Sequence, residues 1–312
     1  MIEDALRFQG GFEIQVQLEG ADLPDYGYRR RVAFHIAPDG KIGFYKHGTN
    51  ALVEIDRCLI LMQELNLALT NYGPAISKYG TLFADLILEK ESLIWVALRA
   101  REKASIEAVQ DALSELKLVI PNLRVYFNEK PLFQQQDFKE LQSAHPVGRF
   151  SQVNAVGNEV LKRTVTVLSK SDSVTELYAG AGNFSLPLAE LGKKVQAIEI
   201  DPELVRAGNE LSLQSGFGDL IKFYQISCER FIKDHKVSAE IVLDPPRSGA
   251  KEVVRLLRPE STSRIIYISC NLPSLVRDLK ILSCQGYKLE QVKMIDMFAQ
   301  THHVETVSVL SS

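Results

Sequence analysis

The sequence has few cysteines and no long hydrophobic run, and each scarcity counts against a class of protein. The four cysteines, Cys58, Cys228, Cys270 and Cys284, form no C-x-x-C pair and have no closely spaced histidines, so neither a zinc site nor a disulfide framework is indicated. No apolar stretch approaches the roughly 18 residues of a membrane helix, and the first residues are acidic rather than basic. We therefore expect a cytoplasmic protein with reduced thiols, no metal site and no membrane contact.

A strongly basic charge balance is also missing. The formal net charge is -3 at pH 7, whereas domains that bind nucleic acid are often strongly basic, so any contact with nucleic acid must be local. The chain of 312 residues is long enough for two domains, and 46% hydrophobic with 24% charged residues is an ordinary globular balance. We expect two domains, a substantial core and a monomer.

A stretch rich in proline and glycine, residues 143–150, separates two differently patterned parts of the chain. We place a domain boundary there, with one domain over residues 1–145 and the other over residues 146–312. In the first part, strand-like runs alternate with helix-like runs, which predicts an α+β domain. The strand-like runs are residues 30–36, 82–88 and 92–98, and the helix-like runs are residues 55–72 and 105–118.

In the second part the alternation becomes regular. Apolar strands separated by helical stretches predict a parallel sheet with right-handed crossovers, so the fold class is α/β. Two further strand candidates, residues 288–297 and 305–310, close the chain. The first five predicted strands are residues 174–178, 195–200, 221–226, 241–244 and 265–269.

The first of these strands runs into a tight turn that contains Gly180 and Gly182. Glycines allow the backbone to approach a ligand closely, with free N–H groups facing it. The third glycine of a dinucleotide fingerprint is replaced by Ser185, which weakens a nicotinamide or flavin interpretation. Glu199 ends the next strand, where a carboxylate can accept hydrogen bonds from both hydroxyls of a ribose. Together these features suit S-adenosylmethionine.

Two residues beside the glycine turn allow more than one role. Asn183 is a candidate for ligand contact or for capping the following helix. Tyr178 is a candidate for core packing.

Asp244 ends the fourth strand before two prolines, which stiffen the turn and hold the carboxylate at the edge of the sheet. A ligand-binding role and a simple turn cap remain alternatives for Asp244.

Cys270 follows a buried-looking strand instead of lying within it. A buried cysteine usually acts as a small hydrophobe, and we expect this of the other three cysteines. At Cys270, however, Pro273 helps to start a helix whose N-terminus would stabilise a thiolate. Glu305 begins the last strand among apolar and hydroxyl residues, where an acid needs a partner or a task. We interpret Cys270 as a nucleophile and Glu305 as a general base.

Two adjacent histidines, His302 and His303, precede Glu305. Neighbouring residues on an extended chain point to opposite faces, so we do not expect them to share a metal.

Five stretches of the second part resemble the family of RNA uracil-C5 methyltransferases, which make 5-methyluridine in transfer and ribosomal RNA with S-adenosylmethionine. They occur in the family's order and include the cysteine and glutamate regions. The resemblance implies a class I methyltransferase domain with a mostly parallel seven-stranded sheet, preceded by an RNA-binding α+β domain. The stretches are residues 150–154, 180–184, 244–247, 269–279 and 300–306.

The resemblance also implies roles for individual residues. Cys270 corresponds to the catalytic nucleophile and Glu305 to the base. The cofactor-binding positions are Gln152, Tyr178, Gly180, Gly182, Asn183, Glu199 and Asp244. Many members carry an N-terminal oligonucleotide-binding barrel and an iron–sulfur cluster held by four cysteines. Cys58 resembles the last of those ligands, but no cysteine lies upstream of it, so we expect neither the cluster nor the barrel.

The resemblance predicts transfer of a methyl group to C5 of a loop uridine in tRNA or rRNA. Arg247 and Arg277 are candidates for stabilising the thiolate of Cys270. Two alternatives remain open, namely an S-adenosylmethionine-dependent methyltransferase that acts on an amine through the Asp-Pro-Pro loop, and an RNA-binding module with vestigial catalysis. The predicted phosphate contacts are Arg29, Arg30, Arg31, Arg99, Arg101 and Lys103.

Overall fold

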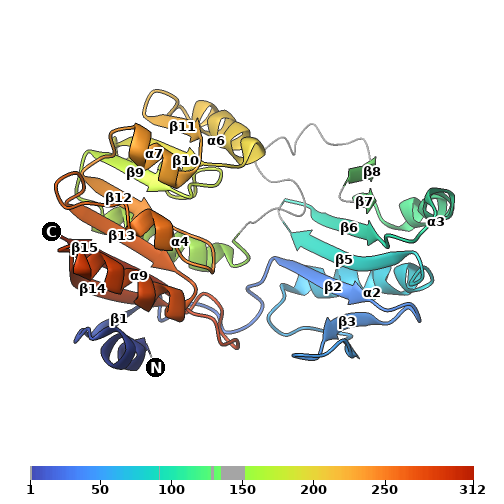
Figure 1. Ribbon diagram of the computed structural model, residues 1–312. Helices are drawn as coiled ribbons and strands as arrows, with labels where there is room; N and C mark the ends of the chain where they lie inside the picture. Colours follow the sequence, from blue (N-terminus) through green and yellow to red (C-terminus); the bar gives the residue numbers. More distant parts are fainter. Residues whose placement is uncertain (1, 91, 128–129, 135–151) are drawn as a thin grey trace. The chain divides into compact units, whose positions relative to one another are not determined.

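The computed structural model describes residues 2–90, 92–127, 130–134 and 152–312 of the chain (Figure 1). The described residues form two compact units. The larger unit contains the residues up to Leu23 and those from Val156 to Ser312, and the smaller unit contains those from Pro24 to Gln134 and from Gln152 to Ala155. The predicted boundary at residues 143–150 lies outside the described residues.

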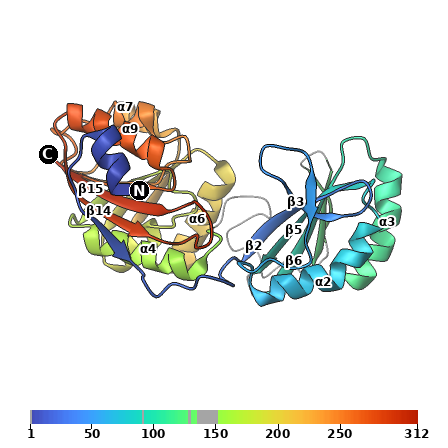
Figure 2. The same cartoon turned by 90° about the horizontal axis from the view of Figure 1, so that it is seen from below.

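The smaller unit is a seven-stranded sheet with two helices on one face (Figure 2). Both helices pack apolar side chains, among them Leu65 and Leu113, on a core shared with the sheet. The strand order is β4-β3-β2-β5-β6-β7-β8. The elements are β2 (Arg31–Ile36), β3 (Ile42–Tyr45), β4 (Leu52–Glu54), α2 (Gln63–Ser77), β5 (Phe83–Lys90), β6 (Ile94–Ala100), α3 (Ile106–Val119), β7 (Leu123–Phe127) and β8 (Lys130–Gln134).

The predicted helix over residues 55–72 begins too early. Residues 55–61 form a loop, and α2 begins at Gln63 and continues to Ser77. The side chain of Asn66 explains this start, because its Oδ1 accepts a hydrogen bond from Cys58 N at 2.9 Å and its Nδ2 donates to Cys58 O at 3.0 Å. Both bonds join the side chain of Asn66 to the main chain of Cys58. They hold the residues before α2 in a turn and prevent the helix from starting earlier.

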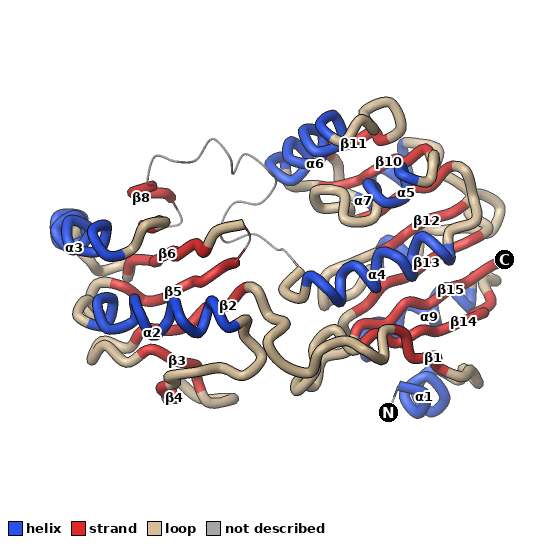
Figure 3. Tube along the Cα trace, turned by 180° about the vertical axis from the view of Figure 1, so that it is seen from behind, coloured by secondary structure: helices blue, strands red, loops and turns tan. Residues whose placement is uncertain are grey.

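The larger unit is an eight-stranded sheet covered by helices on both faces (Figures 1 and 3). All neighbouring strands are parallel except β15, which is antiparallel to both of its neighbours. This confirms the α/β class and the mostly parallel sheet. The strand order is β1-β14-β15-β13-β12-β9-β10-β11.

Its strands are β1 (Val16–Glu19), β9 (Ser173–Leu177), β10 (Lys194–Glu199), β11 (Ile221–Gln225), β12 (Glu240–Leu243), β13 (Arg264–Ser269), β14 (Lys288–Ile295) and β15 (Glu305–Ser311). Its helices are α1 (Ile2–Asp4), η1 (Ala5–Gly10), α4 (Ala155–Leu168), α5 (Ser185–Glu190), α6 (Pro202–Gln214), α7 (Cys228–Asp234), α8 (Lys251–Val254) and α9 (Leu272–Cys284). The strands β12 and β13 are almost entirely buried, which is why they read as continuous apolar runs.

The N-terminal segment belongs to the larger unit, which corrects the predicted domain over residues 1–145. Strand β1 pairs in parallel with β14, with Val16 opposite Val292, and adds an eighth strand to the seven predicted. The preceding turn of helix packs on α9: Leu6 is fully buried, and Lys280 Nζ donates to Gln9 O at 3.0 Å. A strand of four residues with two exposed side chains carries too little pattern to be recognised alone.

Candidate active site

The glycine turn after β9 is held in place by two acidic side chains. Glu176 is buried, and it accepts hydrogen bonds from Ser185 Oγ and, at 3.3 Å, from Phe184 N. Glu199, at the end of β10, accepts from Gly180 N at 2.9 Å. Burial raises the pKa of Glu176 to about 8. Both carboxyl groups therefore tie the turn to the ends of neighbouring strands.

The turn itself needs unusual backbone angles. Tyr178, Gly180 and Gly182 have φ values of 61°, 58° and 93°, which are strained for residues other than glycine. A Cβ added at Gly180 would meet no atom within 4 Å, so the turn has an open side on which a ligand can approach the backbone. Tyr178 is half-buried and packs on the core of the unit, as expected for a core residue.

Asn183 does not cap the following helix, so that alternative is wrong. The N-cap of α5 is Phe184, which makes no side-chain capping bond. The amide of Asn183 instead pairs reciprocally with that of Asn158 on α4, at 2.9 and 3.1 Å. Sequence reasoning missed Asn158, because nothing in its local pattern points to a partner 25 residues away.

Asp244 follows β12 and lies at the same edge of the sheet as the glycine turn. Its main-chain N donates to Leu177 O at 3.4 Å. Burial raises the pKa of its carboxyl to about 7, although it keeps some exposed surface. Its charge also raises the pKa values of Glu176 and Glu305, so three carboxyl groups share this edge.

Cys270 and Glu305 are brought together by the pairing of β13 with β15. Ser269 lies opposite Thr306 in this antiparallel ladder, and Thr306 Oγ1 donates to Ser269 O at 2.9 Å. Cys270 follows Ser269 and Glu305 precedes Thr306, so the two residues lie at the same end of the two strands, next to their last pair.

The electrostatic environment links the same two residues. Burial raises the pKa of the Cys270 thiol, and the charges of Glu305 and Asp244 raise it further, whereas Arg247 lowers it by its charge and by a hydrogen bond. Glu305 is only 4% exposed, and burial followed by the charge of Asp244 raises its pKa well above the usual value. Of the two arginines predicted to act on the thiol, Arg247 does so.

The loop before β15 corrects the argument about the two histidines. The rings of His302 and His303 lie side by side, with centroids 3.9 Å apart, because the chain there is bent and not extended. His303 also contacts Arg247, whose Nη2 lies 2.9 Å from His303 Nε2. Within the described ranges, no group of three or more potential metal ligands occurs.

The remaining predicted residues fall in different surroundings. Gln152 belongs to the smaller unit, where its carbonyl accepts from Arg30 Nε at 2.9 Å, so it is not gathered with the others within one unit. Cys228 is buried, as expected, whereas Cys58 is half-buried and Cys284, the last residue of α9, is exposed. The expectation of a buried thiol is therefore wrong for Cys284.

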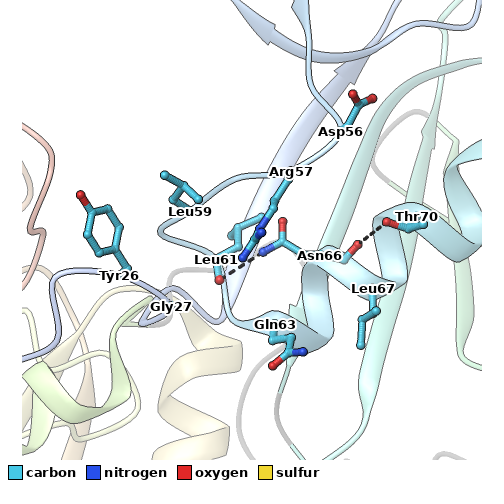
Figure 4. A pocket seen from close by; sticks show the side chains of 10 residues that line it. All are labelled: Tyr26, Gly27, Asp56, Arg57, Leu59, Leu61, Gln63, Asn66, Leu67 and Thr70. Carbon is cyan, nitrogen blue, oxygen red and sulfur yellow. Dashed lines mark hydrogen bonds between the residues drawn. The ribbon is translucent and has the colours of Figure 1, made fainter.

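The smaller unit has a pocket of about 560 Å³ next to the loop that carries Cys58 (Figure 4). Asn66 holds this loop and also donates to Leu61 O at 3.3 Å, as Figure 4 shows. None of the residues predicted to act in catalysis or cofactor binding lines the pocket. The lining residues are Tyr26, Gly27, Asp56, Arg57, Leu59, Leu61, Gln63, Asn66, Leu67 and Thr70.

No helix in the part of the chain that the structure describes is both long and apolar enough to cross a membrane. The sheet of the larger unit, its glycine turn and the acid at the end of β10 define a class I methyltransferase fold. A likeness to a solved structure supports this fold. The crystal structure of Pyrococcus abyssi tRNA (uracil-54, C5)-methyltransferase in complex with S-adenosyl-L-homocysteine matches with a TM-score of 0.76 at 20% identity, covering 99% of this chain and 81% of that chain.

Sequence comparisons identify the family. The model of the tRNA (uracil-5-)-methyltransferase family matches residues 124–312. The 23S rRNA (uracil(1939)-C(5))-methyltransferase RlmD of Shewanella sp. (strain MR-7) is 31% identical, covering 93% of this chain and 72% of that protein. The same enzyme of Pseudomonas fluorescens (strain Pf0-1) is 30% identical, covering 93% and 67%. The chain therefore belongs to the tRNA (uracil-5-)-methyltransferase family and is an RNA uracil-5-methyltransferase.

We expect Arg247→Gln to raise the pKa of the Cys270 thiol, because the guanidinium favours the thiolate. Alkylation of Cys270 by iodoacetamide, followed by mass spectrometry of its peptide, should then require a higher pH. Arg230→Gln is a matched control, since this exposed arginine pairs with Asp234 on α7 and is not among the charges that act on the thiol. An unchanged pH profile for Arg247→Gln would contradict the assignment.

Proposed function

We propose that this protein transfers a methyl group from S-adenosylmethionine to C5 of a uridine in RNA, through a covalent bond between Cys270 and C6 of the base. The observation that supports this proposal is the register of β13 and β15, whose last pair, Ser269 and Thr306, adjoins Cys270 and Glu305 at the edge of the sheet. A thiol and a buried carboxyl at the same end of two paired strands can act on the two adjacent carbons of one pyrimidine ring.

The thiolate is the form of Cys270 that reacts. Attack of Cys270 Sγ on C6 forms the S–C6 bond and moves the electron pair of the C5=C6 bond toward C5 and O4, which makes C5 nucleophilic. Arg247 favours the thiolate. Cys270 also immediately precedes Asn271, the N-cap of the 13-residue helix α9, whose N-terminal dipole favours negative charge. These two influences oppose the burial that disfavours the thiolate.

The residues around the glycine turn suit S-adenosylmethionine. The open side of Gly180 and the carboxylate of Glu199 fit an adenosyl group with ribose hydroxyls, and the acidic edge formed with Asp244 suits a positively charged ligand. When bound, this cofactor supplies an electrophilic methyl group. We assign cofactor contact to Tyr178, Gly180, Gly182, Asn183, Glu199 and Asp244, which all belong to the larger unit.

Glu305 is the proposed base. After C5 carries the methyl group, its proton must leave so that the C5=C6 bond can re-form and expel the thiolate of Cys270. The burial that raises the pKa of Glu305 also makes its ionised form a stronger proton acceptor than an ordinary surface glutamate. The carboxyl group thus removes a proton from carbon more readily than an exposed acid would.

RNA contact is proposed for the helix-free face of the smaller unit. Some of the predicted cations hold the backbone of this unit. Arg30 Nε donates to Gln152 O, and Arg101 Nε and Nη2 donate to Gly80 O and Ile36 O. Guanidinium groups used in this way organise the chain. Arg99 differs from Arg30 and Arg101, because its bonded partner is a side chain.

Arg99, Asp85 and His35 form one row across β6, β5 and β2. Asp85, with a side chain only 6% exposed, accepts from Arg99 Nε at 2.7 Å and lies 2.7 Å from His35 Nδ1. The side chains of Arg99 and His35 are 48% and 38% exposed, and His35 stacks on Tyr45 at 4.2 Å. Asp85 is buried below Arg99 and His35, so the exposed part of the row consists of hydrogen-bond donors and the aromatic ring of Tyr45. The donors suit contact with phosphate, and the ring suits stacking with a base.

The named relatives act on 23S rRNA, which favours ribosomal over transfer RNA as the substrate. The target base must leave its stack to reach a half-buried thiol, and this costs less in a loop than in a paired stem. We therefore propose a loop uridine.

Cys270→Ala should abolish the covalent complex with RNA that contains 5-fluorouridine, because no other thiol lies beside Glu305. Electrophoresis under denaturing conditions measures this complex. Cys284→Ala removes the exposed thiol at the end of α9 and is the control that should retain the complex. Methyl transfer that survives Cys270→Ala would favour an amine-directed enzyme. RNA binding without calorimetric binding of S-adenosylmethionine would favour a vestigial module.

Glu305→Gln should allow the thiol to add to the base but block release. With ordinary uridine RNA and S-adenosylmethionine, a covalent protein–RNA complex should accumulate while turnover falls, because Gln cannot accept the C5 proton. Glu290→Gln on the neighbouring strand β14 serves as the control and should turn over normally. If Glu305→Gln released methylated RNA at the original rate, another group would be the base.

Arg99→Gln should weaken RNA binding and lower the slope of log K against log salt by about one, as expected for the loss of one phosphate contact. Fluorescence anisotropy at several salt concentrations measures the slope, with Arg230→Gln as the control. Methylation at saturating RNA should change little. A slope equal to that of the unchanged protein would remove Arg99 from the RNA interface.

A further inference from the structure

Asp278 on α9 joins the three segments that surround the thiol. It has no exposed surface. Its Oδ2 accepts from Tyr267 Oη on β13 and from Ala250 N, both at 2.7 Å, and its Oδ1 accepts from Arg277 Nε at 2.8 Å. One carboxylate thus connects the strand that leads to Cys270, the helix that follows it and the end of the loop over residues 244–250.

The loop approaches this carboxylate too closely for a side chain to intervene. Gly249 has a φ of 77°, and an added Cβ would lie 2.5 Å from Arg277 Nη2 and 2.6 Å from Asp278 Oδ2. Arg277 Nη2 also donates to Ser248 O at 2.9 Å. The end of the loop is therefore held at two main-chain atoms, Ser248 O and Ala250 N, and only glycine permits the packing between them.

This attachment bears on Arg247, which lies one residue before Ser248. The charges that act most strongly on the thiol of Cys270 are those of Glu305, Arg247 and Asp244. Arg247 is exposed and contacts His303 at 2.9 Å. Because the backbone of Arg247 is part of this loop, the distance of its guanidinium from the thiol depends on where the loop is fixed.

We propose that Asp278 is a positioning residue, which keeps Arg247 beside Cys270 by fixing the end of the loop over residues 244–250. A buried charge with three donors is costly to keep, and its three partners here are the segments that build the nucleophile's surroundings. The inference rests on the proposed role of Cys270, but its effect on the thiol can be measured without catalysis.

The test compares two buried acids, Asp278 on α9 and Glu240 on β12. Glu240, at the start of the strand, is fully buried, accepts from Lys170 N at 2.9 Å and from Ser169 Oγ, and pairs with Arg264 at 3.5 Å. It lies about 13 Å along the strand from Asp244. Asp278→Asn and Glu240→Gln should both lower the melting temperature of the full-length protein, so that measurement alone does not separate positioning from structure.

The pH profile of Cys270 alkylation does separate them. We expect Asp278→Asn to raise the apparent thiol pKa, with about tenfold less thiolate at neutral pH for each unit, and Glu240→Gln to leave it unchanged. In the Arg247→Gln background, Asp278→Asn should add nothing further. Equal profiles for Asp278→Asn and Glu240→Gln, or a full additional shift in the double variant, would overturn the proposal.

Tyr267→Phe keeps the test valid if Asp278→Asn does not fold. It removes one hydrogen bond to Asp278 and leaves every charge in place, so it should raise the thiol pKa by a smaller amount in the same direction. No shift in this variant would count against the proposal. Failure of Cys270→Ala to abolish the RNA complex would instead reject Cys270 as the nucleophile, without altering the alkylation result.

Discussion

The antiparallel pairing of β15 with β13 is the constraint on which the candidate active site depends. It is the exception in a sheet whose other neighbours are parallel, and it brings the beginning of the last strand to the end of β13. Cys270 and Glu305 thereby meet although 34 residues separate them. A slip of one residue would turn Glu305 to the opposite face, so the bond from Thr306 Oγ1 to Ser269 O stabilises the proposed site as well as the sheet.

Acidic side chains outnumber basic ones at this edge of the sheet. Glu176, Asp244 and Glu305 are buried enough to raise their pKa values, and Asp244 raises the other two. Against them stands Arg247, which favours negative charge on Cys270. A positive charge brought to this edge would lower the pKa values of the carboxyl groups and favour their ionised forms. The acidic surroundings therefore suit a cationic ligand and a base that must be ionised to work.

The sequence predicts those parts of the fold whose evidence is local. Strands β12 and β13 are buried on both faces, so their apolar runs locate them within a residue, and a cysteine and a glutamate at strand ends are visible without coordinates. Features made by distant partners are not visible. The pairing of Asn158 with Asn183, the strand that Val16 begins beside β14 and the network of Asp278 depend on contacts across the fold, which no periodicity records.

The arginines of the smaller unit show that function, like the fold, depends on contacts that the sequence pattern does not record. Arg30, Arg99 and Arg101 look alike in sequence, yet two of them donate to main-chain carbonyls and one rests on Asp85. A guanidinium that holds the backbone cannot turn toward a phosphate without breaking the structure around it. In a chain with a net charge of -3, attraction for RNA depends on where cations lie and not on an overall positive charge, and a buried acid such as Asp85 decides how a cation such as Arg99 is held.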